Sequence, residues 1–324
     1  MHKINWGVLG TADIARGATI PGMQRAANCN LYAVAGRSLE KAERYRTEFG
    51  FEKAYEGYDA LLGDPAVEAV YIPLPNSLHA EWSIRAMKAG KHVLCEKPLA
   101  ANEAEAKRLF DTAKECGVHL MEAFAYLHSP LTAAIKAELD TGAIGEVRYI
   151  ENAFVTSGYD QTNIRMHRDL LGGGFYDLGC YCVSQVLWLL GEPDSVSALG
   201  EFNADGVDTL ATGVLGYKNG ARAVFNCGLM LAPTVGKRLD RLLIFGTEGV
   251  LRTDAEYNQR GRLCYQIQRG DTVTTKYVDT PHNYALEVEQ LGRCIAEGET
   301  PWVSAEFSVM NARTMDRVLK AIGY

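Results

Sequence analysis

Residues 4–121 alternate between short apolar runs and amphipathic segments, and this alternation limits the possible fold more than any other feature of the chain. Apolar runs typical of buried strands lie at residues 4–9, 31–35, 67–72, 92–95 and 118–121. Segments with helical spacing of apolar residues lie between them, at residues 13–27, 39–49, 78–89 and 102–116. This alternation predicts a parallel sheet with helices on both faces. With right-handed crossovers, the sheet is doubly wound.

The second half of the chain has the pattern of an antiparallel sheet. Strand-like runs follow one another with turn residues between most of them, at residues 147–156, 196–202, 209–217, 221–229, 238–245 and 263–268. The sequence Lys218-Asn219-Gly220 separates two of these runs and predicts a hairpin. Helices are expected at residues 131–139, 176–190, 285–297 and 305–322. We therefore predict an α/β chain with a doubly wound domain at residues 1–121. An α+β domain with an open, largely antiparallel sheet follows at residues 122–324.

Length and composition exclude several classes of protein. A chain of 324 residues is long enough for two domains of ordinary size. Its formal net charge of −7 gives no basic field for nucleic acid. No apolar run approaches the ~20 residues that a membrane helix needs. The start of the chain lacks a signal-peptide pattern, and the eight cysteines form no C-x-x-C pair. We therefore expect a cytoplasmic protein with reduced thiols and neither a nucleic-acid nor a membrane partner.

A turn of small residues follows the first predicted strand. Gly10, Ala12 and Ala15 occupy the three small-residue positions of the dinucleotide-binding fingerprint, although alanine replaces glycine at the second. The start of the next helix would present amide groups and a positive dipole end to a diphosphate. A tight turn without a ligand is the alternative. The predicted cofactor-binding residues of this turn are Gly10, Thr11, Ala12, Asp13 and Ile14.

The end of the second predicted strand favours NADP over NAD. Sites specific for NAD place a carboxylate at this position to bind the adenosine ribose. Here the chain has Arg37 and Ser38 instead, which suit a 2′-phosphate. Glu40 falls in the following helix, beyond the expected contact point. The alternative is that Arg37 is a solvated loop residue.

Two polar segments follow later strands of the first half, where open parallel sheets bind their ligands. The first lies after residues 67–72 and the second after residues 92–95. Asn76 could instead cap the helix that follows it. The cofactor-binding residues expected in these segments are Pro73, Asn76, His79, Glu96 and Lys97.

In this order and spacing, the G-x-x-G-x-A start, the P-N-x-x-H loop and the E-K-P turn resemble the Gfo/Idh/MocA oxidoreductases. The resemblance continues at residues 172–182, GGGFYDLGCYC, which is similar to the glycine-rich helix start of that family. Most of the wider family has His where this chain has Tyr181. With tyrosine at this position, the chain resembles the branch of the family that contains dimeric dihydrodiol dehydrogenase and NADP-dependent D-xylose dehydrogenase.

The resemblance implies a Rossmann domain, NADP(H) as cofactor and a second domain with an open sheet. It also implies hydride exchange with a carbinol or carbonyl carbon of a small-molecule substrate, namely a sugar, a cyclic diol or a related polyol. A homodimer or a dimer of dimers is expected through the open sheet. From the same resemblance, we expect a cis Lys97–Pro98 peptide bond and contacts of Asn76 and His79 with the nicotinamide half of the cofactor.

The resemblance also places Lys97 and Tyr181 at the substrate oxygen, with Asp177 one helical turn before Tyr181. Hydride exchange needs a group that holds or releases a proton there. The ordinary pKa of tyrosine is about 10, and a nearby ammonium favours the phenolate. We predict Tyr181 as the acid/base, Lys97 as its electrostatic partner and Asp177 as a hydrogen-bond acceptor for substrate. From the residues alone, a tyrosine on an apolar helix is more often a core aromatic.

Further substrate-site residues are expected at Glu122, Arg165 and His167, although Arg165 could equally be a solvated loop residue. The alternative function is a cofactor-sensing regulator without catalysis, which would be expected to lose the lysine or the acid/base. A glycosidase of the same family would be expected to have the His form of the motif and an NAD-type second strand. The pair Cys180 and Cys182 is too small a group to predict a metal site.

Overall fold

The computed structural model describes residues 2–158, 160–231 and 238–324. Contacts divide the chain into two compact units. The first unit consists of Met1–His128 with His282–Val309, and the second consists of Ser129–Pro281 with Met310–Tyr324. The chain therefore changes units after residue 128 and returns to the first unit, whereas the sequence predicted one boundary at residue 121. The return occurs because helix α8 (Asn283–Glu297) buries an apolar side against strands and helices of the first unit.

The first unit contains the predicted doubly wound parallel sheet. Its strand order is β3-β2-β1-β4-β5-β6, and every pair of neighbouring strands is parallel. The short strand β3 is partly exposed and lacks an apolar run, so the sequence pattern did not predict it. The strands are β1 (Ile4–Leu9), β2 (Cys29–Gly36), β3 (Lys53–Glu56), β4 (Ala69–Ile72), β5 (His92–Glu96) and β6 (Leu120–Ala123).

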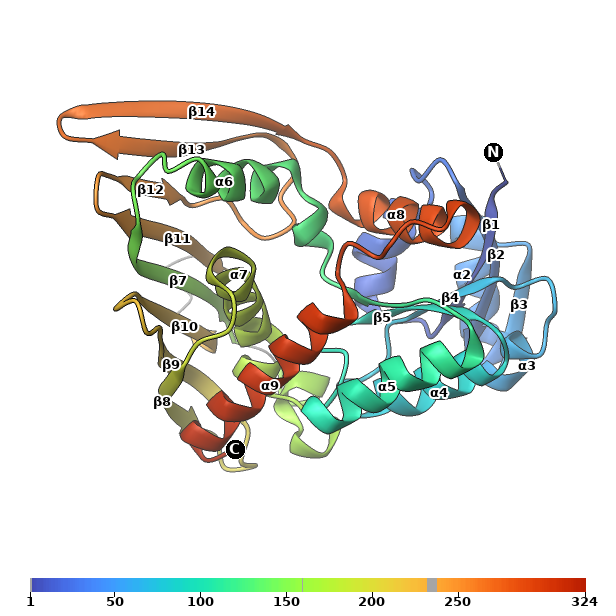
Figure 1. The fold of residues 1–324 in the computed structure, drawn as a ribbon. Coiled ribbons are helices and arrows are strands. Elements are labelled where there is room, and N and C mark those ends of the chain that lie inside the picture. The colour runs from blue at the N-terminus through green and yellow to red at the C-terminus, as the bar shows by residue number, and fades with distance from the viewer. Residues whose placement is uncertain (1, 159, 232–237) are drawn as a thin grey trace. The chain divides into compact units, whose positions relative to one another are not determined.

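The helices of the first unit begin and end at residues suited to those positions. The Asn102 side chain accepts a hydrogen bond from the Glu105 amide at the start of α5, and Gly117 ends that helix with φ of 68°. Helices α4 and α5 pack together, as do α1 and α8, on opposite sides of the sheet (Figure 1). In addition to α8, the helices are α1 (Ile20–Met23), α2 (Leu39–Phe49), α3 (Tyr58–Leu62), α4 (His79–Lys88) and α5 (Glu103–Cys116).

The second unit contains an eight-stranded sheet with the order β14-β13-β12-β11-β7-β10-β9-β8. Only the pairing of β7 with β10 is parallel among the pairs described, which confirms the prediction of a largely antiparallel sheet. The predicted hairpin joins β9 and β10, and Gly220 in its turn has φ of 87°. The strands are β7 (Val147–Ser157), β8 (Ser195–Phe202), β9 (Asp208–Gly216), β10 (Arg222–Leu231), β11 (Arg238–Gly246), β12 (Val250–Thr253), β13 (Gly261–Arg269) and β14 (Thr272–Thr280).

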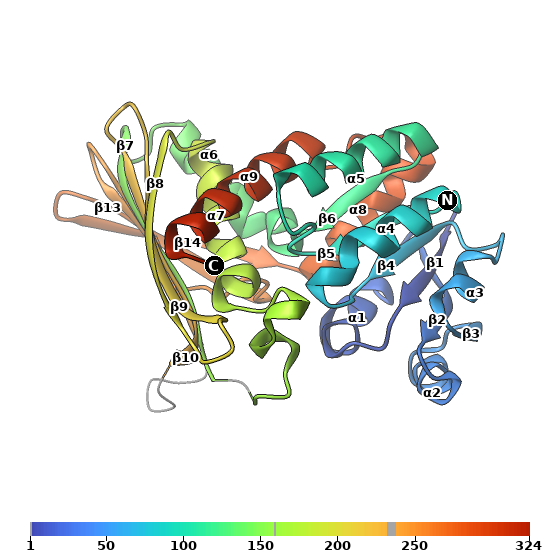
Figure 2. The ribbon, with the colours of Figure 1, turned by 90° about the horizontal axis from the view of Figure 1, so that it is seen from below.

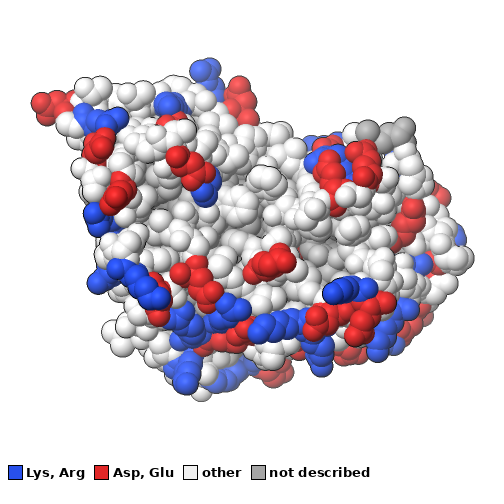
Figure 3. Space-filling model, viewed as in Figure 1, with Lys and Arg blue, Asp and Glu red and all other residues white. Residues whose placement is uncertain are grey.

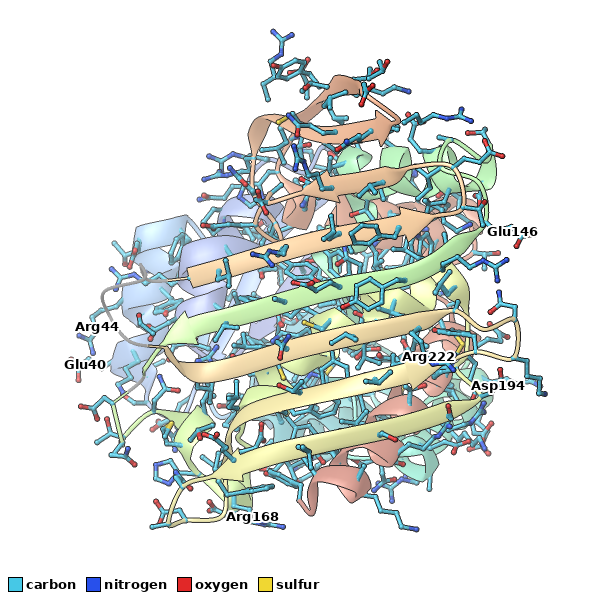
Figure 4. The ribbon with its side chains drawn as sticks, turned by 90° about the vertical axis from the view of Figure 1, so that its left-hand side faces the viewer. Glu40, Arg44, Glu146, Arg168, Asp194 and Arg222 are labelled. Atoms are coloured by element: carbon cyan, nitrogen blue, oxygen red, sulfur yellow. The ribbon has the colours of Figure 1, made fainter. Side chains whose placement is uncertain are left out.

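Helices cover one face of this sheet. Helix α6 (Pro130–Asp140) packs on β13 and β14, while α7 (Cys180–Leu190) packs on β7 and β10, and both lie on the same side (Figure 2). The last helix is α9 (Ala305–Ile322). In Figure 4 the strands lie in front of these helices, and the side chains of the uncovered face point toward the viewer. Alternate residues are buried where a strand lies under the helices, as Ala211 and Leu215 are in β9, whereas β8 has no buried residue.

The residues that the structure describes can be searched for membrane-spanning helices, disulfide bonds and metal-binding groups. No helix there combines the length and apolarity needed to cross a bilayer. No disulfide bond links the eight cysteines, which all lie within the described ranges. The same residues contain no group of His, Cys, Asp and Glu suited to a metal ion. On the face shown in Figure 3, positive and negative side chains lie interspersed.

Gly22 allows α1 and α8 to approach each other closely. A Cβ atom at Gly22 would lie 2.7 Å from the Tyr284 Cβ, whereas a Cβ at Gly17 would meet nothing within 4 Å. We expect Gly22→Ala to lower the free energy of unfolding by about 1–3 kcal/mol, as overpacking does. Gly17→Ala is the matched control and should be neutral or slightly stabilising. Denaturant unfolding measures both, and equal stability of the two variants would contradict this packing argument.

Candidate active site

The turn after β1 has the geometry expected of a phosphate-binding turn. Gly10 has φ of 123°, which favours glycine. A Cβ atom there would lie 3.1 Å from the Leu74 Cδ2 and 3.9 Å from the Tyr58 hydroxyl. The chain is helical from Asp13 onward, and the helix includes a π-helical turn, Ala15–Thr19, of a kind frequent at functional sites. The predicted residues Thr11, Ala12, Asp13 and Ile14 are all at least partly exposed beside this turn.

A cation and a phenol lie together beside the turn. Arg37 is exposed at the end of β2. Burial raises the pKa of Tyr58, and the charge of Arg37 counteracts this, so Arg37 lies within electrostatic range of the Tyr58 hydroxyl. Glu40 instead pairs with Arg44 along α2, at 3.6 Å; both are labelled in Figure 4. Sequence reasoning missed Tyr58, because its neighbour Arg37 is distant in the chain.

Ser38 and Pro73 occupy supporting positions. Ser38 precedes α2 with an extended backbone and is partly exposed. Pro73 is buried, and its Cγ lies 4.0 Å from the Cβ position at Gly10. Asn76 is partly exposed and begins a short 3₁₀ turn, Asn76–Leu78, before α4. These residues therefore shape the loops at the carboxyl ends of β2 and β4.

His79 joins two of these loops from within the protein. It is fully buried, and its Nδ1 and Nε2 each lie 2.8 Å from a main-chain carbonyl oxygen, of Pro98 and Leu74 respectively. Burial lowers the pKa of His79 to about 4; the two carbonyls oppose this shift and the charge of Lys97 adds to it. A neutral ring donates to only one carbonyl at a time. His79 therefore lies beneath the loops, with no part of its side chain exposed, and its expected contact with the cofactor stays a prediction.

The E-K-P turn is anchored by a buried carboxylate. The Glu96 Oε1 accepts a hydrogen bond from the Tyr71 hydroxyl at 2.5 Å, and Tyr71 accepts one from the Thr19 hydroxyl at 2.8 Å. Glu96 is 7% exposed, and its Oε1 is directed into the protein, while its expected contact with the cofactor stays a prediction. The Lys97–Pro98 peptide bond is cis, as expected, and Lys97 is partly exposed.

Glu122 lies beneath the same turn. Its Oε1 accepts a hydrogen bond from the Leu99 amide at 2.9 Å, and the residue is only 2% exposed. Burial raises the pKa of Glu122 to about 7, although the Ser308 hydroxyl, the Leu99 amide and the charge of Lys97 favour its ionised form. The expected place of Glu122 on a substrate rim is corrected: it is a buried neighbour of Lys97.

In the second unit, a buried carboxylate from β9 fixes the start of the helix that bears Asp177 and Tyr181. The Asp208 Oδ2 accepts a hydrogen bond from the Phe175 amide at 2.7 Å. A Cβ atom at Gly173 would lie 2.1 Å from the Asp208 Oδ1, so the position requires glycine. The hydroxyl of the last residue, Tyr324, donates to the Gly172 carbonyl at 2.9 Å. Sequence reasoning missed Asp208 and Tyr324, because their partners lie far away in the chain.

The structure brings two predicted site residues together. The Arg165 Nε donates to the Asp177 Oδ2 at 2.5 Å, and the Asp177 side chain is 14% exposed. Asp177 lies in a π-helical turn, Phe175–Gly179, that leads into α7. His167 is exposed, two residues beyond Arg165. Arg165 therefore holds a carboxylate in place and is not a solvated loop residue.

Tyr181 lies in a cluster of three aromatic rings on α7, β7 and the loop after β12. Its ring centroid is 5.4 Å from that of Phe154 and 5.0 Å from that of Tyr257. Phe154 and Tyr257 stack on each other at 5.2 Å. Tyr181 is 9% exposed, so its ring packs in the cluster while a small part of the residue stays accessible.

Comparison with known proteins identifies the family. Residues 4–124 match the family described as "Oxidoreductase family, NAD-binding Rossmann fold", and residues 132–252 match the "GFO/IDH/MocA C-terminal domain". Over 322 residues the chain is 38% identical to a D-xylose 1-dehydrogenase (NADP(+)) of Haloferax volcanii, with 98% of this chain and 96% of that protein covered. The chain belongs to the Gfo/Idh/MocA oxidoreductase family. It is therefore an oxidoreductase whose first unit is an NAD(P)-binding Rossmann domain.

Other relatives within the Gfo/Idh/MocA family have related names. A trans-1,2-dihydrobenzene-1,2-diol dehydrogenase of Xenopus tropicalis is 30% identical over 332 residues, which cover 98% of each chain. A solved 3-ketoreductase of Actinomadura kijaniata, in complex with NADP and TDP-benzene, superposes with a TM-score of 0.93. It is 31% identical, and the match covers 99% of this chain and 98% of that one. The relatives thus act on different substrates within one fold.

The burial of Glu122 predicts a pH-dependent stability. Its pKa is about 7 in the folded chain and 4.5 ordinarily, so protonated Glu122 stabilises the fold at low pH and this contribution is lost as the pH rises through 7. Glu122→Gln keeps an acceptor for Leu99 and removes the titration. Each pKa unit corresponds to about 1.4 kcal/mol. Between about pH 5 and about pH 8, wild type should lose about 3 kcal/mol relative to the variant. Denaturant unfolding at both pH values tests this, and parallel pH dependences would contradict it.

Proposed function

We propose that this member of the Gfo/Idh/MocA family is an NADP-dependent dehydrogenase or reductase acting on CH–OH groups. Its substrate would be a sugar, a cyclic diol or a related small polyol. The observation that carries the proposal is the near full-length similarity to the Haloferax D-xylose dehydrogenase in a chain that has Lys97, Asp177 and Tyr181. A screen of aldoses, inositols, cyclic diols and dicarbonyls with NADP⁺ or NADPH tests it. No turnover of any class would favour the non-catalytic regulator.

The residues around Gly10 fit a dinucleotide. The glycine keeps the main chain open where a Cβ would approach Leu74, and the helix from Asp13 directs its amino end toward the turn. NADP(H), when bound, accepts or supplies the hydride. Residues of the chain that would bind its diphosphate are those of the turn, while Arg37 and Ser38 would bind the 2′-phosphate.

The protein's own groups would move the proton and orient the substrate. The ammonium of Lys97 would bind the reacting oxygen and favour negative charge on it. The hydroxyl of Tyr181 would take the proton from a carbinol or return it to a carbonyl. Asp177, held by Arg165 at 2.5 Å, would accept a hydrogen bond from a neighbouring substrate hydroxyl. The pairing with Arg165 keeps the Asp177 carboxylate oriented before substrate binds.

Replacement of Lys97 tests the proton-relay assignment. Lys97→Met should lower kcat by at least about 100-fold, because the charge at the reacting oxygen is removed. NADPH binding, measured by fluorescence titration, should stay nearly intact. Lys88→Met, at the exposed end of α4, is the matched control and should retain full activity. Normal turnover by the Lys97→Met protein would refute the assigned role.

Replacement of Arg37 tests the choice of cofactor. Arg37→Ala removes a charged hydrogen-bond donor to a 2′-phosphate and should weaken NADPH binding by about 10- to 100-fold. NADH binding should change little, because NADH lacks that phosphate. Arg44→Ala, in an exposed pair with Glu40 on α2, is the control and should leave both cofactors unaffected. Equal weakening of both cofactors would show that Arg37 does not bind the phosphate.

We propose that the uncovered face of the second sheet forms a homodimer interface. By strand register, exposed apolar side chains lie on it, including Leu199, which is 81% exposed, and Phe245, whose ring packs near Tyr149. Apolar surface of this kind marks an interface. Phe245→Glu should convert dimers into monomers in sedimentation experiments, whereas Leu39→Glu on α2 should not. A monomeric wild-type protein at micromolar concentration would exclude the dimer.

The cytoplasmic location stays a prediction.

A further inference from the structure

An ion pair braces the aromatic cluster around Tyr181. Arg238 begins β11, and its Cζ lies 4.3 Å from the centroid of the Phe154 ring. Asp240 stands two residues later on the same face of the strand, opposite Phe154 in the sheet register. The Arg238 guanidinium donates two hydrogen bonds to the Asp240 carboxylate, at 2.5 and 2.7 Å. The pair therefore lies directly against the rings that surround Tyr181.

Both members of the pair also bind the main chain of Tyr257. Arg238 donates to the Tyr257 carbonyl at 3.2 Å, and Asp240 accepts from the Tyr257 amide at 2.9 Å. The Tyr257 hydroxyl is fixed in turn, with Gln185 at 2.7 Å and Asn152 at 3.1 Å. Because both the main chain and the hydroxyl of Tyr257 are hydrogen-bonded, its ring is held in a fixed position against Tyr181. Asp240 is 5% exposed, so bulk water screens this arrangement little.

We propose that Arg238, held in place by Asp240, is a positioning residue for Tyr181 that orients its ring and favours its phenolate. The inference rests on the proposed function of Tyr181 as acid/base and deepens it. Arg238 would act as a cation for Tyr181 from within the same unit of the chain. A phenolate close to a fixed guanidinium is stabilised, most strongly where solvent is excluded.

The charged groups near Tyr181 set the sign of the effect. Burial works to lower the pKa of Arg238, but the hydrogen bond and charge of Asp240 raise it, with smaller contributions from Glu256 and the Tyr181 phenolate. The Glu256 Oε2 lies 3.8 Å from the Arg238 Nε. Asp177, one turn before Tyr181, is paired with Arg165, and the buried thiols of Cys180 and Cys182 flank the tyrosine on α7.

Because Asp240 offsets part of the guanidinium charge, the two partners should have opposite effects. Removing the cation should make the Tyr181 phenolate less stable, whereas removing the anion should leave Arg238 less neutralised and the phenolate more stable. A purely structural brace would not produce such a pair of opposite shifts. If the two residues only held the aromatic rings in place, removing either one would shift the Tyr181 midpoint in the same direction or leave it unchanged.

Ultraviolet titration of tyrosinate provides the test, in the full-length protein without substrate or cofactor. The signal of Tyr181 is the difference between each protein and its own Tyr181→Phe version. Arg238→Met should raise the midpoint by about one pH unit or more, and Asp240→Asn should lower it. Arg238→Lys, which keeps the charge, should stay near wild type. Arg241→Met is the matched control, because Arg241 pairs with Glu151 at 2.7 Å on the opposite face of the same strand.

Unchanged midpoints in both Arg238→Met and Asp240→Asn would overturn the proposal, as would shifts in the same direction. A wild-type midpoint at or above that of an ordinary tyrosine would also overturn it. If Arg238→Met fails to fold, the Asp240→Asn shift decides alone. Where a substrate is turned over, the pH profile of kcat/KM should shift in parallel. Absence of turnover would count against the proposed function only, because the titration requires no activity.

Discussion

Buried side chains that bond to main-chain groups hold the functional turns of both units in place. His79 contacts the Leu74 and Pro98 carbonyls, Glu122 binds the Leu99 amide, and Asp208 binds the Phe175 amide. An unpaired main-chain group in such a place would be costly, so each contact restricts the turn to one geometry. The turns carry the groups proposed for chemistry, while the side chains that fix them are buried away from substrate.

Burial explains the unusual protonation of these supporting groups. It lowers the pKa of His79 to about 4 and raises those of Glu122 to about 7 and Asp208 to about 6. Such shifts are commonly associated with catalytic residues, but here the groups face main-chain atoms. The groups proposed for proton transfer lie instead where some exposure remains, as at Lys97 and Tyr181. In the second unit, ion pairs with arginines orient the acids Asp177 and Asp240.

The sequence predicted elements with strong local patterns and missed those without them. The five buried strands of the first sheet, the hairpin at Lys218–Gly220 and the cis Lys97–Pro98 bond are all confirmed. Strand β3 was missed, because Lys53–Glu56 is short and partly exposed. The return of α8 to the first unit was also missed, since its apolar side could cover either sheet. For the site, the ligand contacts stay predictions, and the sequence did not indicate that His79 and Glu122 are buried.

By itself, the sequence determined the two sheet types and the glycine turn, and it supplied the residues proposed for proton transfer. Periodicity and turn chemistry act over a few neighbouring residues, so they can be inferred without knowing the path of the chain. Only the tertiary structure decided which of these residues are exposed and which partners they have. Arg37 with Tyr58, Phe175 with Asp208, and Phe154 with Arg238 join segments 21, 33 and 84 residues apart. Such contacts depend on how the sheets are assembled, which no local pattern contains.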